Sequence, residues 1–126
     1  MDKILVAEDS FALANLLEFV LSNAGFDVTL CRTGSSAWQT AQEQKFDILL
    51  LDQQMPGMTG VEVLTAIRND SPNRETNAFL CTAKTHELDL QNLHETLAIK
   101  GVFHKPFSPK DLVENLKQQT QVSTTN

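Results

Sequence analysis

Five short apolar runs alternate with stretches of helical periodicity along nearly the whole chain, and this alternation limits the folds open to it. The runs are Lys3–Ala7, Phe26–Cys31, Phe46–Leu51, Asn77–Ala83 and Ile99–His104. Strands that alternate with helices connect through right-handed crossovers into a parallel sheet, with helices packed on both faces. The sequence therefore predicts a doubly wound α/β fold with a five-stranded parallel sheet and five helices.

The segments between these runs carry helix signals of their own. In the first segment, apolar residues recur at the spacing of one helix face, with Ser10 as the expected N-cap and Gly25 as the stop. That face is formed by Leu13, Leu16, Leu17, Val20, Leu21 and Ala24. We expect the other helices over residues 35–44, 59–69 and 85–98 and from 108 to about 118, with the sparsest apolar pattern in 85–98.

Composition narrows the possible functions. The 126 residues suit a single domain, which we place at residues 1–119, and residues 120–126 read as a polar tail or the start of a linker. A net charge of −6 argues against nucleic-acid contact by this domain. Cys31 and Cys81 lack metal-ligand spacing and are expected to be reduced. Without a signal-peptide core or an apolar run of membrane-spanning length, the sequence predicts a cytoplasmic protein that does not contact the membrane.

Polar residues gather where the predicted strands end. Glu8 and Asp9 follow the first strand, Asp52 follows the third, Thr82 lies at the end of the fourth, and Lys105 follows the fifth. The carboxyl ends of parallel strands meet at one edge of the sheet, where ligands bind in such folds. Three carboxylates at one edge repel each other unless a cation joins them, and an all-oxygen site suits Mg²⁺. Lys105 and Thr82 add the donors that a phosphoryl group requires.

The order and spacing of five signatures resemble the receiver domain of two-component response regulators. The signatures are Glu8-Asp9, Asp52 at a strand end, Met55-Pro56-Gly57 with Gly60 after it, Thr82-Ala83 and Lys105-Pro106-Phe107. The resemblance covers the chain from residue 3 to about residue 118. It implies the flavodoxin-like strand order 2-1-3-4-5.

This resemblance implies a phosphorylation site that depends on Mg²⁺ or another divalent ion. Asp52 would accept a phosphoryl group from a sensor histidine kinase or a phosphotransfer protein. Asp9, Asp52 and the backbone carbonyl of Gln54 would bind the ion directly, and Glu8 would hold it through water. Phosphoryl transfer depends on positioning and charge neutralisation, which such a site supplies. The chain would then act as a signalling switch and not as an enzyme, since it would catalyse only its own phosphorylation and dephosphorylation.

Further roles follow from the same resemblance. Lys105 would pair with the phosphoryl oxygens, and Thr82 would move to hydrogen-bond one of them. The small side chain of Ala83 would leave the path to the phosphoacceptor open. Gln54 and Lys84 occupy positions that in the family influence the lifetime of the aspartyl phosphate.

One position departs from the family pattern. Receivers usually carry Tyr or Phe three residues before the lysine, and this chain has Val102 there. Phe103 follows, but neighbouring residues on a strand face opposite sides, so Phe103 is not an obvious substitute. The resemblance places the output surface at Thr85 to Gln118, where a downstream protein target would bind, and implies a monomer or a phosphorylation-dependent dimer.

Other functions are open from sequence alone. A Mg²⁺-dependent phosphohydrolase with an aspartate nucleophile would usually carry a second acid two residues later, where this chain has Gln54. An FMN carrier would need a phosphate loop where Glu8 and Asp9 would repel phosphate. A degenerate receiver that acts only as a binding module would not need the intact set of acids, threonine and lysine.

Overall fold

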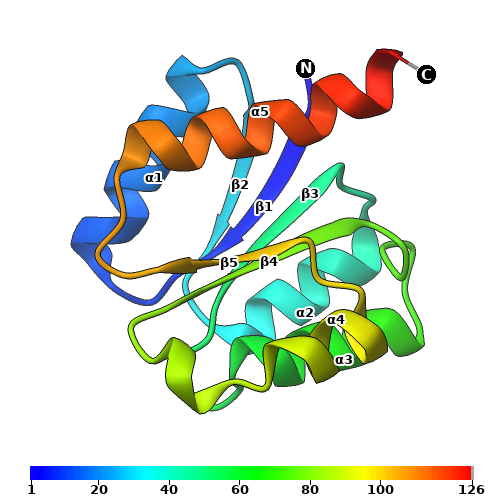
Figure 1. The fold of residues 1–126 in the computed structure, drawn as a ribbon. Helices are drawn as coiled ribbons and strands as arrows, with labels where there is room; N and C mark the ends of the chain where they lie inside the picture. Colours follow the sequence, from blue (N-terminus) through cyan, green and yellow to red (C-terminus); the bar gives the residue numbers. More distant parts are fainter. Residues whose placement is uncertain (126) are drawn as a thin grey trace.

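The computed structural model describes the backbone of residues 1–125 and the side-chain surroundings of residues 1–119, and it contains five parallel strands in the order β2-β1-β3-β4-β5 (Figure 1). This confirms the predicted fold and strand order. The strands are β1 (Lys3–Ala7), β2 (Asp27–Cys31), β3 (Ile48–Asp52), β4 (Asn77–Thr82) and β5 (Gly101–His104). The helices are α1 (Phe11–Asn23), α2 (Gly34–Glu43), α3 (Gly60–Asn69), α4 (Leu90–Leu97) and α5 (Pro109–Thr125).

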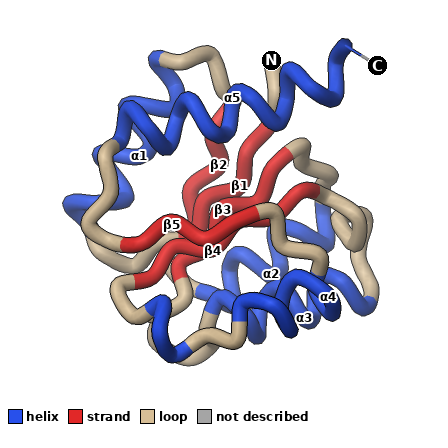
Figure 2. Tube along the Cα trace, in the orientation of Figure 1, coloured by secondary structure: helices blue, strands red, loops and turns tan. Residues whose placement is uncertain are grey.

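The helices form a layer on each face of the sheet. Helices α1 and α5 cover one face, and α2, α3 and α4 cover the other (Figure 2). Successive residues of β1 alternate between the two layers, because Ile4 packs in the cluster that contains Leu17 of α1, whereas Leu5 packs in the cluster that contains Leu64 of α3. The central strand β3 is buried at all five positions, as a strand covered on both faces should be.

Strand β3 begins at Ile48, two residues later than the predicted start at Phe46. Phe46 is nevertheless buried, and its backbone N–H donates 2.7 Å to Asn73 Oδ1 instead of to a neighbouring strand. Asp47 N donates to Lys3 O. Phe46 therefore packs in the core although it lies in the turn before the strand. Apolar patterning alone does not distinguish such a residue from a residue of the strand itself.

Helix α1 begins and ends as predicted but differs on one face. The Ser10 side chain accepts from Leu13 N, and Gly25 takes a positive φ of 99° just after the helix. The prediction that Leu16 faces inward is wrong, because this residue is 42% exposed. Phe11 and Phe19 are also exposed, so this helix carries apolar side chains on its outer surface as well as its inner one.

The predicted helix over 85–98 is wrong in its first part. A short 3₁₀ turn over Thr85–Glu87 precedes α4, which begins at Leu90. The Asp89 side chain accepts from Asn92 N and caps α4, and Ala98 ends it with φ of 55°. Of the few apolar residues in this helix, Leu90 is 46% exposed, while Leu93 and Leu97 are buried.

Helix α5 continues through residues 120–125, which the sequence suggested as a polar tail, and Asn126 lies outside the described residues. Both cysteines are free and buried. Within the described part of the chain, no helix is long and apolar enough to cross a membrane.

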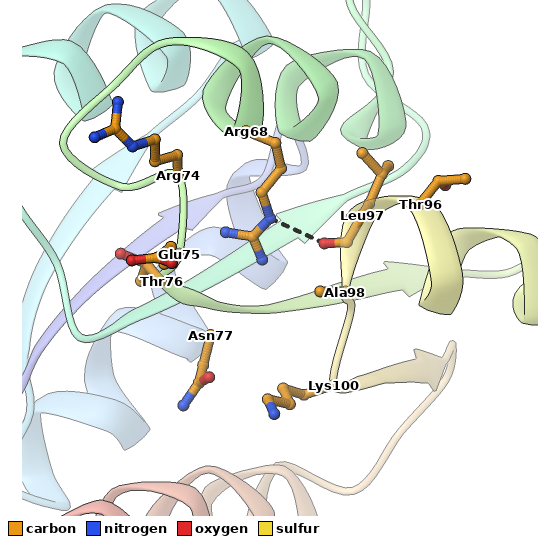
Figure 3. A pocket seen from close by; sticks show the side chains of 9 residues that line it. All are labelled: Arg68, Arg74, Glu75, Thr76, Asn77, Thr96, Leu97, Ala98 and Lys100. Atoms are coloured by element: carbon orange, nitrogen blue, oxygen red, sulfur yellow. Dashed lines mark hydrogen bonds between the residues drawn. The ribbon is translucent and has the colours of Figure 1, made fainter.

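A pocket of about 450 Å³ opens at the edge of the sheet where β4 and β5 begin (Figure 3). Arg68 lies in it and donates from Nε to Leu97 O at 2.9 Å and from Nη1 to Asn73 O at 3.1 Å. The guanidinium thus joins the end of α3 to the end of α4. This edge of the sheet is opposite the edge that carries Glu8, Asp9 and Asp52.

Candidate functional site

The carboxyl ends of the strands bring the predicted polar residues to one edge of the sheet. Glu8 and Asp9 directly follow β1, and Asp52 closes β3, the neighbour of β1. Thr82 closes β4, which pairs with β3 so that Asp52 lies opposite Cys81. Lys105 follows β5, and its backbone N–H donates to Thr82 O at 2.8 Å. The parallel topology alone therefore assembles residues that are far apart in sequence.

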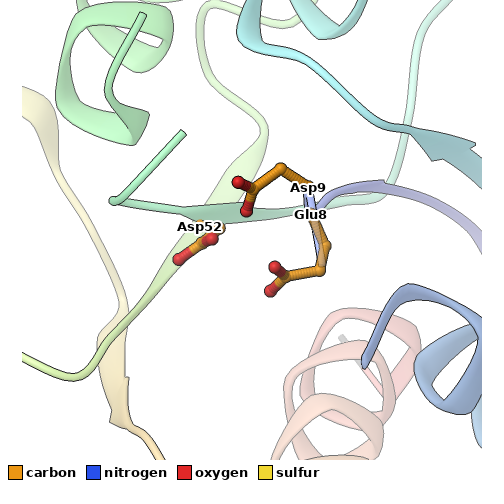
Figure 4. Close-up of side chains that lie close together, drawn as sticks. All are labelled: Glu8, Asp9 and Asp52. Carbon is orange, nitrogen blue, oxygen red and sulfur yellow. The ribbon is translucent and has the colours of Figure 1, made fainter. Parts of the chain in front are cut away.

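Three carboxylates of this edge form a compact cluster (Figure 4). One carboxylate oxygen from each of Glu8, Asp9 and Asp52 lies within 4.8 Å of the others. Glu8 is 1% exposed and Asp52 is 2% exposed, whereas Asp9 is more open to solvent. Two acids are thus held away from water, and the third lies at the mouth of the site beside a pocket of about 480 Å³.

Lys105 links the two buried acids. Its Nζ lies 2.9 Å from Glu8 Oε1 and 3.0 Å from Asp52 Oδ1. Glu8 Oε2 also accepts from Ser10 N at 3.0 Å, so both oxygens of Glu8 have partners. A single ammonium cannot neutralise three ionised carboxylates, and the cluster keeps an excess of negative charge.

The pKa of Asp52 is shifted by its buried, negatively charged surroundings. The pKa of Asp52 is raised from its ordinary value of 3.8 to about 7, chiefly by burial and then by the charge of Glu8, while the hydrogen bond and charge of Lys105 oppose the rise. Burial lowers the pKa of Lys105, but its hydrogen bonds to Glu8 and Asp52 outweigh burial and leave that pKa raised. An additional cation would therefore favour the ionised form of Asp52.

The loop after β3 packs tightly beneath Asp52. A Cβ at Gly60 would lie 2.6 Å from the carbonyl oxygen of Asp52, closer than side-chain atoms approach. Gly60 N donates to Gln53 O, and Thr59 with Glu62 forms a capping box that opens α3. The absence of a side chain at residue 60 allows α3 to begin directly against the backbone of Asp52.

Thr82 is fully buried and has two hydrogen-bond partners. Its Oγ1 donates to Gln54 Oε1 at 3.0 Å and accepts from Lys84 N at 2.9 Å. Gln54 N also donates a long hydrogen bond of 3.4 Å to Asp52 Oδ1. The Gln54 side chain therefore contacts the threonine, a role that the sequence analysis did not assign.

Arg32 is a second residue that the sequence analysis missed. Its Nη2 donates to the backbone oxygen of Asp9 at 2.9 Å, and its guanidinium lies 5.1 Å from the centre of the Phe11 ring. Arg32 directly follows β2, so the strand-end rule that selected Asp52 would have found it. The hydrogen bond from Arg32 holds the backbone of Asp9 in place at the site.

The side chains of Ala83 and Lys84 are exposed at the rim. Val102 packs with the α3 and α4 layer, and Phe103 packs on the opposite face, 5.6 Å from the Phe79 ring centre. Val102 and Phe103 thus face opposite sides of the sheet, as expected for neighbouring residues on a strand. A pocket of about 250 Å³ lies beside Val102, lined also by Leu90, His94, Ile99, Lys100 and Gly101.

The donor set fits a hard divalent cation. Glu8, Asp9 and Asp52 offer carboxylate oxygens close enough to surround one ion, and the partly open position of Asp9 leaves room for water ligands. Burial and the charge of Glu8 raise the pKa of Asp52, so a bound cation would favour its ionised form. These properties match Mg²⁺, which keeps several waters and takes few carboxylates.

Comparisons with known proteins agree with this geometry. The sequence model of the response regulator receiver domain matches residues 4–117. The DNA-binding response regulator MtrA of Mycolicibacterium smegmatis is 37% identical over 115 residues, which are 91% of this chain and 49% of the relative. MtrA of Mycobacterium tuberculosis is 36% identical with the same coverage. The chain thus spans about half the length of the curated relatives it matches.

Solved structures show the same fold. The chemotaxis protein CheY4 of Vibrio cholerae has a TM-score of 0.84 and 30% identity, covering 94% of this chain and 98% of that one. TrrA of Thermotoga maritima, in complex with Mg²⁺ and BeF, has a TM-score of 0.81 and 28% identity, covering 94% and 99%. The receiver domain of a Pseudomonas aeruginosa sensor histidine kinase, with magnesium in its active-site cleft, has a TM-score of 0.83 and 26% identity, covering 94% and 96%. With its motifs, fold and acidic cluster in agreement, this chain belongs to the response regulator receiver domain family.

Proposed function

We propose that this chain is a phosphorylation-controlled switch in which Asp52 accepts a phosphoryl group from a phosphohistidine. The observation that carries the proposal is the position of Asp52, 2% exposed, 3.0 Å from Lys105 Nζ and within the cluster formed with Glu8 and Asp9. A carboxylate nucleophile, a fixed cation and a metal-binding set are what phosphoryl transfer requires. The donor would be a sensor histidine kinase or a phosphotransfer protein.

The proposed metal is Mg²⁺, held by Asp9, Asp52 and the backbone carbonyl of Gln54, with Glu8 acting through water. When bound, it would neutralise charge on the acids and on the phosphoryl oxygens. Lys105 already contacts Asp52 and would follow the phosphoryl oxygens as they arrive. Thr82 would donate its hydroxyl to one of these oxygens, which would bring the loop after β4 inward.

The proposed consequence is a shift between two conformations. A phosphoryl group adds about −1.5 to −2 charge, and it can favour only the conformation that offers it more contacts. Thr82 and Lys105 lie at the ends of β4 and β5, so their movement would reach residues 85–118. A downstream partner would bind there, and the domain would act as a monomer or as a phosphorylation-dependent dimer inside the cytoplasm.

The outer face of α1 supports contact with a protein donor. Phe11 and Phe19 are 68% and 66% exposed on the helix that begins two residues after Asp9. Exposed aromatic side chains are characteristic of protein interfaces. A histidine-bearing donor that reached Asp52 would pass over this helix.

Turnover of external substrates is less well supported. Residue 54 is glutamine, which cannot serve as the general acid that phosphohydrolases of this type carry, and its side chain is engaged with Thr82. The intact cluster also argues against a receiver that serves only for binding.

The test is incubation with a small phosphodonor and Mg²⁺, followed by intact mass measurement. Wild type should gain one phosphoryl group, Asp52→Asn none, and Asp9→Asn much less. Chelation of the metal should abolish labelling of wild type. Equal labelling of Asp52→Asn, or labelling that ignores chelation, would contradict the proposal.

A further inference from the structure

The side chain of Gln54 connects the loop after β3 to the end of β4. Its Oε1 accepts a 3.0 Å hydrogen bond from Thr82 Oγ1, and Lys84 N donates 2.9 Å to the same hydroxyl. A hydroxyl has only one hydrogen to donate. In this structure the acceptor of that hydrogen is Gln54.

The same residue also contacts the proposed phosphoacceptor. Gln54 N donates to Asp52 Oδ1 at 3.4 Å, so residue 54 lies between Asp52 and Thr82. Thr82 is 0% exposed, and water therefore does not replace its partner freely. Before Thr82 can donate to a phosphoryl oxygen on Asp52, its bond to Gln54 must break.

We propose that Gln54 is a positioning residue whose side chain holds Thr82 in the unphosphorylated orientation. This inference rests on the proposed function, in which Thr82 turns toward a phosphorylated Asp52. The bond stabilises only the resting conformation, so its loss shifts the population toward the active one. Gln54 itself is exposed, and water competes for its amide, which places the expected shift at about two- to fivefold.

The matched pair for the test is Gln54→Met and Gln53→Met. Methionine keeps the length of the side chain and removes the amide acceptor. Gln53 Oε1 accepts from Val61 N at 2.9 Å, so Gln53→Met removes a hydrogen bond of the same kind without touching Thr82. Gln54→Glu retains an acceptor at the same position and provides the conservative rescue.

The first measurement uses the unphosphorylated protein. Three-bond NMR couplings report the χ1 rotamer populations of Thr82 in wild type and in each variant. We expect a changed rotamer population in Gln54→Met and wild-type populations in Gln53→Met and Gln54→Glu. Unchanged Thr82 couplings in Gln54→Met would overturn the proposal, as would an equal change in Gln53→Met.

The second measurement uses beryllofluoride with Mg²⁺ as a phosphoryl mimic, followed by fluorine NMR. Gln54→Met should bind it about two- to fivefold more tightly than wild type, because less of the protein must leave the resting state. Gln53→Met should bind it like wild type. Equal affinity in Gln54→Met would contradict the positioning role. Failure of wild type to bind beryllofluoride would instead contradict the proposed function of Asp52, and the Thr82 couplings would still decide the role of Gln54.

Discussion

At the scale of single residues, the site is defined by how two buried acids share one lysine. Glu8 and Asp52 both lie within 3.0 Å of Lys105 Nζ, and both are nearly inaccessible to solvent. Glu8 has a second donor in Ser10 N, whereas Asp52 has only a long contact from Gln54 N. This difference in hydrogen bonding agrees with the raised pKa of Asp52.

The raised pKa makes Asp52 a source of pH-dependent instability in metal-free protein. Its folded-state pKa of about 7 exceeds the ordinary value of 3.8, so the folded state holds the proton more tightly than the unfolded chain. Stability should therefore fall as pH rises from about 4 to about 7. Asp52→Asn cannot ionise, and it should gain about 1–3 kcal/mol in free energy of unfolding, relative to wild type, between pH 4 and pH 8.

Denaturant titrations in chelator at several pH values measure this gain. The exposed Asp27 on β2 provides the matched control, since Asp27→Asn should leave the wild-type pH profile unchanged. If the difference in free energy of unfolding between Asp52→Asn and wild type stayed constant across this pH range, the raised pKa of Asp52 would be contradicted.

Gly60 should tolerate no side chain. A Cβ would meet the Asp52 carbonyl oxygen at 2.6 Å, and the next nearest atoms, Asp52 C at 3.1 Å and Gln53 Cα at 3.2 Å, also belong to the backbone and cannot rotate away. We expect Gly60→Ala to cost about 1–3 kcal/mol in thermal or chemical unfolding. Gly101→Ala is the control, because its Cβ would lie 3.5 Å from the Phe79 ring, an ordinary contact. Equal free energies of unfolding for Gly60→Ala and Gly101→Ala would contradict the close approach of Gly60 to the Asp52 backbone.

At the scale of elements, Asn73 holds the edge of the sheet opposite the site. It is 0% exposed, accepts from Phe46 N at 2.7 Å, and donates from Nδ2 to Ala41 O and Gln44 O at 2.8 Å each. One side chain thus joins α2, the turn before β3 and the loop after α3. Its removal would leave several buried backbone groups without partners.

Asn73→Ala should therefore destabilise the fold by about 2–4 kcal/mol. The control is Asn69→Ala, which changes the same residue type at an exposed position four residues earlier. The control should change stability by less than about 0.5 kcal/mol. Urea titration of both variants measures the difference, and similar losses would mean that the Asn73 network contributes little.

The sequence predicted the existence and order of the elements better than their surfaces and ends. In α1 the apolar spacing did not separate the buried Leu17 from the exposed Leu16, since both fit a broad helix face. The apolar spacing over 85–98 predicts one helix, whereas in the structure Asp89 caps α4 and separates it from a 3₁₀ turn over Thr85–Glu87. Local hydrogen bonding of short polar side chains decided that boundary, and hydrophobic periodicity does not report it.

At the scale of the whole molecule, the parallel topology places the candidate functional site and the structural hydrogen bonds of Arg68 and Asn73 at opposite edges of the sheet. The carboxyl ends of the strands carry Asp52 and its partners, and the opposite edge carries Arg68 and Asn73 with their backbone acceptors. Convergence of the acids was predictable from sequence, because it needs only strand ends in a known order. The contact between Gln54 and Thr82 was not, because it depends on a side-chain conformation in a loop.

Magnesium binding should depend on pH through the same site. Mg²⁺ requires ionised Asp52, whose pKa is about 7 without metal, so affinity should fall as pH drops below 7 and binding should release protons there. Calorimetric titration in buffers of different ionisation enthalpy measures both effects. Asp9→Asn should weaken binding roughly tenfold or more. Proton release that is equal at pH 6 and pH 8 would contradict the linkage to Asp52.

Asp52 is the residue that we propose becomes phosphorylated, and the chemistry of its phosphorylated form allows a direct test. An aspartyl phosphate is an acyl phosphate, which borohydride reduces to homoserine, so the modified position can be read by peptide mass spectrometry. After treatment of the wild-type protein with phosphodonor and Mg²⁺ and then with borohydride, we expect homoserine at residue 52 and unmodified Asp9 and Glu8. Homoserine at another acid, or at no residue of a protein that had gained a phosphoryl group, would contradict it.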